Sequence, residues 1–429
     1  MENNKNICLE LLHREVAPAL GCTEPIAVAL AVAKATETVD YDVVHIEVEV
    51  SANILKNGMG VAIPGTSLIG LDIAAALGAV CGRSCYGLEV LHDVSEKAVA
   101  AAQKYIDSSD VKISAAQSDK KLYIKAIVTG KKGKAVAIIE DCHDRVTRVI
   151  LNDETLFAYE QKNVCAGKAD PSAELAKDLT VEKIVEFGRT IPFEEIEFIL
   201  KSGEMNYSLA EEGLNKKYGL NVGKTVADSR FSYIFGDGVM SYAMSLSAAA
   251  SDARMAGSIL PAMSNSGSGN QGITVTLPVV AVAKKLGSSS EELARALAIS
   301  HLVAIHIKGY LGRLSALCGC VVASSGASCG VVYLMGGSYE QITYSIKNMI
   351  GNVTGMVCDG AKVGCALKVS SGVASAIQSA VLALEDVCIS HNDGIIDKDI
   401  EKTIRNLAYV GTEGMDKADK TMLDIMLAK

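Results

Sequence analysis

Tryptophan is absent from the 429-residue sequence, and aromatic residues together make up only 5% of it. Hydrophobic residues nevertheless account for 49% of the chain, and charged residues for only 21%. A chain of this length and composition can bury a large core, which excludes intrinsic disorder as its overall state. With so few aromatic side chains, we expect small residues to fill the core and to let helices pack closely.

An excess of positive charge is also missing, since 41 Lys and Arg oppose 50 Asp and Glu, for a net charge of −9. Proteins that bind nucleic acids usually present a basic face, so we expect no nucleic-acid partner.

The N-terminal residues Met1–Asn6 lack the basic-then-apolar pattern of a secretory signal. The expected compartment is the cytoplasm.

Long uninterrupted apolar runs are lacking as well. The charge-free stretches 255–283 and 314–339 are the two that need testing as membrane spans. A spanning helix needs about 20 predominantly apolar residues. Pro261 and Pro278 interrupt the first stretch, and repeated Gly and Ser residues interrupt the second. We therefore predict buried helices and site-forming loops in both, and no membrane partner.

Residues 41–165 predict a small mixed domain. Residues 45–50 alternate strictly between polar and apolar side chains, which is typical of a half-buried strand. Two further strands are expected at 122–128 and 134–139, joined by a turn at 129–133. Two helices are expected at 67–80 and 94–106. A helical segment over about residues 1–40, interrupted at Pro18 and at Gly21–Pro25, precedes them. Thr23 is the expected N-cap of the helix that Pro25 opens.

After Pro171 the periodicity is mostly helical, and the clearest segments lie near 239–256, 289–305, 340–351 and 370–386. The charged stretch 166–185 is the expected linker. We therefore predict an α+β fold in which a small mixed α/β domain, residues 1–165, packs on a larger, mainly α-helical domain, residues 166–429.

Twelve cysteines are many for a reducing compartment, where structural disulfides are disfavoured. Five of them stand in apolar or ordinary helical contexts that are typical of small buried residues, namely Cys8, Cys81, Cys85, Cys165 and Cys388. The densest thiol features are Cys318–Cys320 and Cys358–Cys365, which lie among glycines where backbone can approach a bound group. Their spacing matches neither zinc nor ferredoxin motifs, so buried thiols and a metal centre both remain open.

Cys22 differs because its neighbours are polar and it opens a helix. Free N–H groups at a helix N-terminus stabilise a thiolate and lower the pKa of the thiol. Glu24 opposes that effect if it points the same way. The alternative is a capping turn in which Thr23 and Glu24 only satisfy backbone donors.

Two glycine-punctuated segments are candidate binding loops. Ser264–Gly272 has the amides to bind a carboxylate, but it lacks the pattern of a dinucleotide site and that of a P-loop. Its alternative is a flexible connection between helices. Asn53–Thr66 contains Lys56, which either meets an anion or is solvated. We expect His301, on a later helix, to be structural.

Four groups of residues resemble the iron–sulfur L-cysteine desulfidase family, which is related to the α part of iron–sulfur-dependent L-serine dehydratases. They are Gly21–Pro25, Lys56–Gly60 with Ile63–Thr66, Arg313–Cys320 and Cys358–Cys365. The resemblance runs from about residue 10 to 425 and includes Asp393–Ile395 and Gly414–Met415. It is specific for the family and much less specific for the substrate.

The resemblance implies a 4Fe–4S cluster held by three cysteines, with one iron left open. Cys320 matches the dehydratase ligand in a Gly-Cys segment, and Cys358 and Cys365 match the later pair that begins Cys-Asp. That pair is closer together here than in the dehydratases, and Cys318 could replace Cys320 as first ligand.

A cysteine also stands at position 22, where the dehydratases have a Ser-Ser-His-Thr loop, and this favours the desulfidase branch. The family then implies that Cys22, as a thiolate, removes the α-proton of the substrate; the rival role is fourth cluster ligand at rest. The expected substrate-binding residues are Thr23, Glu24, Lys56, Asn57, Asn265 and Ser266.

The activity implied by the resemblance is a carbon–sulfur lyase without pyridoxal phosphate, which eliminates sulfide from L-cysteine to give pyruvate and ammonia. Its partner is a small amino-acid substrate, and we expect a homo-oligomer. Two alternatives stay open: a lyase on L-serine or another small amino or hydroxy acid, and a cluster-free small-molecule binding protein.

Overall fold

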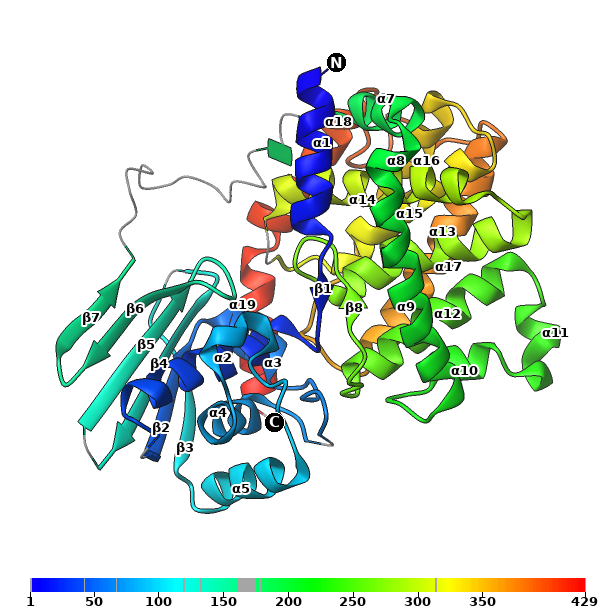
Figure 1. Cartoon of the computed structure of the whole chain (residues 1–429). Helices are drawn as coiled ribbons and strands as arrows, with labels where there is room; N and C mark the ends of the chain where they lie inside the picture. Colours follow the sequence, from blue (N-terminus) through cyan, green and yellow to red (C-terminus); the bar gives the residue numbers. More distant parts are fainter. Residues whose placement is uncertain are drawn as a thin grey trace.

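The computed structural model describes residues 2–41, 43–66, 68–118, 120–131, 133–159, 175–176, 179–312 and 315–428. It consists of a mixed sheet with helices on one face and, beside it, a larger group of helices (Figure 1). The expected α+β class is confirmed. The division at residue 165 stays a prediction, because segments from the two chain ends cross between the two parts.

The sheet has six strands in the order β3-β2-β4-β5-β6-β7. Only the pairing of β2 with β3 is parallel, and each of the other neighbouring pairs is antiparallel. The strands are β2 (Val43–Val50), β3 (Val111–Ala115), β4 (Tyr123–Gly130), β5 (Gly133–Glu140), β6 (Val146–Leu151) and β7 (Glu154–Ala158).

Helices α2 (Thr23–Thr38) and α4 (Leu71–Val80) cover one face of this sheet, and α5 (Glu96–Asp107) packs on α4 (Figure 1). Helix α2 is apolar and buried on almost all sides, as is typical of a helix enclosed by its neighbours. A Cβ at Gly78 would lie 2.5 Å from the carbonyl oxygen of Ala29, so α4 approaches α2 to a distance that only glycine permits. The expected close packing of small residues is confirmed here.

The helical part is built around α15 (Gly319–Leu334), which is buried along almost its whole length. Four helices surround it: α13 (Gly269–Leu286), α14 (Ser290–Leu311), α16 (Tyr339–Val353) and α17 (Cys365–Leu384). The remaining helices of this part are α7 (Val181–Thr190), α8 (Phe193–Ile196), α9 (Leu200–Asn215), α10 (Val222–Val226), α11 (Ser232–Phe235), α12 (Val239–Met255) and α18 (Ile400–Tyr409).

The two terminal helices cross between the parts. Helix α1 (Glu2–Glu15) lies against α7 and α14, and it contributes Leu11 and Leu12 to the core of the helical part. Helix α19 (Asp416–Leu427) lies against α3 (Ala52–Gly58), and Leu423 enters the core beneath the sheet (Figure 1). The two parts are therefore joined at both ends of the chain.

Most expected elements are found near their predicted positions, including the hairpin of β4 and β5. Strands β3, β6 and β7 were not expected. Asn53–Thr66 was predicted as a loop, but its first part is helix α3, because Ile54 and Leu55 turn into the core and the glycines at 58 and 60 follow only at its end. Helix α7 begins inside the expected linker, while Cys165, Arg313 and Leu314 lie outside the described residues.

One helix in the described part of the chain, α17, is long and apolar enough to cross a membrane by length and composition alone. Half of its most apolar window is buried, and it packs on α12, α15 and α16. These contacts are those of a core helix. The stretches at 255–283 and 314–339 form α13, α15 and their preceding loops, as expected.

Candidate active site

A short antiparallel pairing brings two of the predicted loops together. Strand β1 (Pro18–Ala19) pairs with β8 (Ala262–Met263), and the hydroxyl and the N–H of Ser264 both donate to the carbonyl of Ala17. Gly21–Pro25 follows β1, and Ser264–Gly272 follows β8. Because the pairing is antiparallel, the two loops leave the small sheet at opposite ends, and Ser264 and Ser266 run back along residues 15–17. Arg254 links the two loops, since it donates to the carbonyl of Gly21 and to the side chain of Asn270.

The Gly21–Pro25 loop depends on glycine. Gly21 has φ of +63°, and a Cβ there would lie 2.3 Å from Cγ of Pro64. Helix α2 then starts at Thr23, with Cys22 at the N-cap position and no side-chain capping bond. The predicted N-cap role of Thr23 is wrong, because Thr23 is already the first helical residue and its hydroxyl donates to Glu24.

The carboxylate of Glu24 collects three hydrogen bonds within this loop. It accepts from the thiol of Cys22 at 3.1 Å, from the hydroxyl of Thr23 at 3.3 Å and from the amide of Asn57 at 3.0 Å. All four side chains are buried. The structure thus brings together four residues that the sequence had placed on two separate segments.

Burial and the charge of Glu24 raise the pKa of the Cys22 thiol well above its ordinary value, against a lowering effect of Arg254. Burial raises the pKa of Glu24, but His143 and the hydrogen bonds from Cys22 and Asn57 outweigh it, so the net pKa is lowered. Glu24 therefore points at the thiol, and its charge opposes the lowering of the Cys22 pKa that the helix N-terminus would otherwise cause.

The cluster-type cysteines meet at a second backbone pairing. Leu317 and Val357 form an isolated antiparallel bridge. The N–H of Cys318 donates to the carbonyl of Met356 at 3.0 Å, and that of Cys358 donates to the carbonyl of Ala316 at 2.7 Å. Two thiols 40 residues apart in sequence are therefore carried on adjacent backbone segments.

The thiols of Cys318, Cys320, Cys358 and Cys365 are close enough to perturb one another. Cys320 donates a hydrogen bond to Cys318, which lowers the pKa of Cys318 and raises that of Cys320. Burial raises the pKa of Cys358 and that of Cys365, and the charge of Cys318 adds to both effects. Cys365 also packs in one small apolar cluster with Cys22.

Three of these thiols stand at helix N-termini. Cys22 is the N-cap of α2, Cys318 is the N-cap of α15, and Cys365 is the first residue of α17. Unpaired N–H groups and the helix dipole favour negative charge at such positions. The arrangement suits a set of thiolates that share one bound group.

Lys56 is buried, and its contacts are structural. Its ammonium pairs with Asp419 at 2.5 Å and donates to the carbonyl of Cys358 at 3.2 Å. Asn53 also donates to Asp419. These contacts tie α3, the Cys358 segment and α19 together, whereas the substrate contact expected for Lys56 remains a prediction.

Asn265 is likewise committed within the protein. Its amide nitrogen donates to His301, at the ring Nδ1 and at the carbonyl, and its oxygen accepts from Gln271 and Ser266. His301 is fully buried, and burial lowers its pKa to about 3, so its ring is neutral. The structural role expected for His301 agrees with these contacts. Direct substrate binding by Asn265 and Ser266 is still a prediction.

Arg254 and His143 are neighbours of this site that the sequence analysis missed. Arg254 is buried on α12 and donates to the carbonyl of Gly21 at 2.7 Å. A signal existed for Arg254, since it is a charged residue in the stretch 248–257, which is rich in small residues. His143 lies in the β5–β6 connection, and no local pattern ties it to Glu24.

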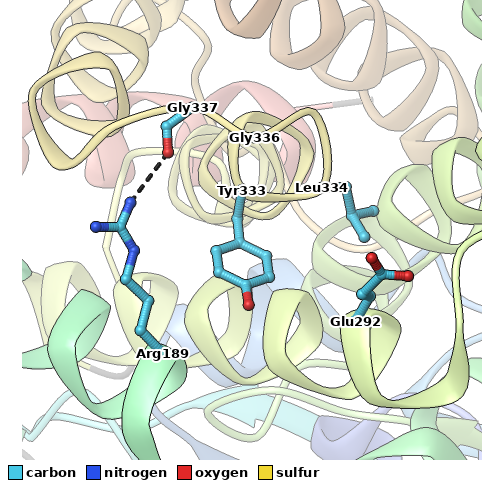
Figure 2. A pocket seen from close by; sticks show the side chains of 6 residues that line it. All are labelled: Arg189, Glu292, Tyr333, Leu334, Gly336 and Gly337. Atoms are coloured by element: carbon cyan, nitrogen blue, oxygen red, sulfur yellow. Dashed lines mark hydrogen bonds between the residues drawn. The ribbon is translucent and has the colours of Figure 1, made fainter.

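A separate hollow of about 350 Å³ lies at the far end of α15 (Figure 2). Its lining is Arg189, Glu292, Tyr333, Leu334, Gly336 and Gly337. Arg189 donates to the carbonyl of Gly337 at 3.0 Å, and the ring of Tyr333 lies between Arg189 and Glu292 in Figure 2. None of the residues predicted from the sequence lines this hollow.

The family model described as "Serine dehydratase alpha chain" matches residues 85–424, which include all four cluster-type cysteines. The chain belongs to this family. It is 51% identical over 423 residues to a UPF0597 protein of Phocaeicola vulgatus, covering 98% of this chain and 97% of the relative. It is also 49% identical over 429 residues to one of Bacteroides fragilis, and 45% identical over 420 residues to one of Clostridioides difficile. The match to the Bacteroides fragilis protein covers 100% of this chain and 99% of the relative. The match to the Clostridioides difficile protein covers 97% of this chain and 98% of the relative.

Serine dehydratase alpha chains are associated with iron–sulfur clusters and with lyase activity, and the resemblance seen in the sequence to the dehydratase side is confirmed. Among the described residues, no three His, Cys, Asp or Glu side chains meet closely enough to hold a single metal ion. A cluster differs from an ion because it takes each thiolate on a different iron, so that its ligands stand further apart.

Unsatisfied polar atoms beside the thiols fit a bound group in this family member. Oε1 of Gln271, Oγ of Ser324 and Oδ1 of Asn57 are buried without a hydrogen-bond partner. The first lies 3.3 Å from the place of a Cβ on Gly319, and a Cβ on Gly372 would meet both Ser324 and Cys320. Buried polar atoms are normally satisfied, so these atoms have hydrogen-bonding capacity left for a water or for a bound group.

Proposed function

We propose that this protein is an iron–sulfur-dependent lyase that converts L-cysteine and water to pyruvate, ammonia and sulfide. The observation that supports this proposal is the meeting of the Cys22–Glu24 pair with the thiols of Cys318, Cys320, Cys358 and Cys365. The proposal puts a dehydratase-type cluster there, beside a thiol in the position of the dehydratase Ser-Ser-His-Thr loop.

Cys320, Cys358 and Cys365 are the proposed ligands, and Cys318 is the alternative to Cys320. The alternative gains support because the charge of Cys318 acts on both Cys358 and Cys365. When bound there, a 4Fe–4S cluster with an open iron supplies a Lewis acid for the substrate carboxylate and its β-sulfur. The network of Lys56 and Asp419 holds the Cys358 segment in place.

Cys22 is the proposed proton-transfer group at the α-carbon. The hydrogen bond to Glu24 orients the sulfur, while the helix N-terminus and the charge of Arg254 favour the thiolate that acts as base. Loss of the α-proton and of sulfide leaves aminoacrylate, which tautomerises to an imine. Water then hydrolyses the imine to pyruvate and ammonia, so no lysine Schiff base is required.

The test is anaerobic reconstitution followed by assays of pyruvate and sulfide with L-cysteine and L-serine. Release of both products from L-cysteine, with little pyruvate from L-serine, is the expected result. Pyruvate from L-serine alone would instead support the second candidate, a serine dehydratase, which the family match favours. Neither product, with iron and sulfide absent from the protein, would support a cluster-free binding protein.

A further inference from the structure

Arg254 is a buried cation that no acid of the described chain neutralises. Only 4% of its surface is exposed, and it forms no ion pair with a described carboxylate. Its partners are neutral: the carbonyl of Gly21 at 2.7 Å, the amide oxygen of Asn270 at 3.2 Å and the sulfur of Met255 at 3.4 Å. An isolated buried charge is strongly unfavourable, so buried arginines are normally paired.

The guanidinium also keeps an unused donor. Its Nε is buried and has no hydrogen-bond partner. Gly269 faces the same edge, because a Cβ built there would lie 2.2 Å from Nε. Any residue other than glycine at position 269 would therefore displace the guanidinium.

The location is the loop of Cys22. Arg254 holds the peptide immediately before Cys22, and Met255 packs with Cys22 and Val61. The carboxylate of Glu24 also contacts the thiol, and the unpaired amide oxygen of Asn57 belongs to the same group of side chains. The thiol thus has both a cation and an anion as neighbours, which is a charge pattern that complements an amino-acid zwitterion.

We propose that Arg254 binds the α-carboxylate of a zwitterionic amino-acid substrate, in the orientation that turns the ammonium group toward Glu24 and Asn57. This assignment rests on the proposed function in taking the ligand to be an amino acid. A carboxylate has about four lone-pair sites on two oxygens, so a bond to guanidinium leaves further sites open. The α-carbon is thereby held beside the Cys22 sulfur.

The experiment compares L-alanine with L-alaninamide by calorimetry on anaerobically purified protein with its full metal content. Neither ligand has a β-leaving group, so binding is measured without turnover, and only L-alanine has the carboxylate. The wild-type protein should bind L-alanine about tenfold more tightly or better. In Arg254→Gln this preference should fall to within about twofold, and Arg254→Lys should be intermediate because it keeps the charge without the fork.

Gly269→Ala is the second variant, since it displaces the guanidinium and keeps the charge; it should also lose most of the preference. Arg189→Gln, which removes an arginine at the separate hollow, is the matched control and should leave the preference unchanged. Full preference in a folded Arg254→Gln, or no preference in the wild type, would overturn the assignment. Absence of sulfide release by a wild type that still shows the preference would overturn the proposed function alone.

Discussion

The thiol of Cys22 donates a hydrogen bond of 3.1 Å to the carboxylate of Glu24, two residues further along the chain. The same carboxylate accepts from Asn57, which comes from α3 beneath the neighbouring loop. A capping turn alone would direct Thr23 and Glu24 to backbone donors. The side chains here are instead directed to one another around the thiol, which makes the pair the natural target for mutation.

Replacing Cys22 by Ser should preserve the cluster and substrate binding while lowering turnover by roughly 10²-fold or more, the usual scale for a positioned acid–base group. Spectra of the cluster with and without L-cysteine separate this role from that of a fourth ligand. An unchanged resting spectrum indicates the proton-transfer role, and a changed one indicates ligation. Near-normal turnover would leave only the capping turn.

Substituting the four cluster-type cysteines one at a time should show which of them bind iron. Cys358→Ala and Cys365→Ala should each abolish iron retention, measured as iron and sulfide content after anaerobic purification. The comparison of Cys318→Ala with Cys320→Ala identifies the first ligand, since only the true one should lose iron. Cys388→Ala is the control, because its thiol bonds the carbonyl of Ile389 beyond the far end of α17. Iron loss in the control would show that the assay reports folding instead.

The ion pair of Lys56 and Asp419 should stabilise the protein, because it neutralises the buried ammonium of Lys56. Asp419→Ala leaves the buried ammonium of Lys56 with only the carbonyl of Cys358. We expect a loss of about 2 kcal/mol, below the usual range for a buried pair because Asp419 is partly exposed. Thermal unfolding measures it. The double variant Lys56→Met with Asp419→Leu should recover most of the loss, and no recovery would contradict a charge-burial origin.

Asp252 should make stability depend on pH in the opposite sense from a salt-bridged carboxylate. Burial raises its pKa from 3.8 to about 6, outweighing the N–H of Gly223, and its Oδ1 has no partner. Between these values the unfolded chain ionises and the folded one does not, so the stability contributed by the neutral form is complete below pH 3.8 and lost as pH rises through 6.

Asp252→Asn should therefore raise the free energy of unfolding at pH 7 by roughly 1–2 kcal/mol, after allowance for screening. The difference from the wild type should disappear near pH 4. Unfolding midpoints across pH 4–8 check this. A variant equally destabilised at both ends of the range would show that the carboxylate is needed for its contact with Gly223 instead.

Much of the fold could be predicted from local patterns. The alternation at 45–50, the apolar periodicity of α12, α14 and α16, and the proline at 25 each express a conformational preference that acts over a few residues. Strands β3, β6 and β7 were missed because their residues are mostly exposed or half-buried, so their alternation is weak. Helix α3 was missed because glycine and asparagine marked its end as a loop.

The sequence by itself determined the candidate residues of the site: Cys22 before a helix, Cys318–Cys320 and Cys358–Cys365 among glycines. Only the tertiary structure decided what each charged neighbour does. Lys56 is held by groups more than 300 residues away, and Asn265 is held in part by His301. Arg254 has no acid partner among the described residues, because pairing depends on which helices pack together. A buried charge takes its role from contacts across the fold, and those contacts have no signature in the local sequence.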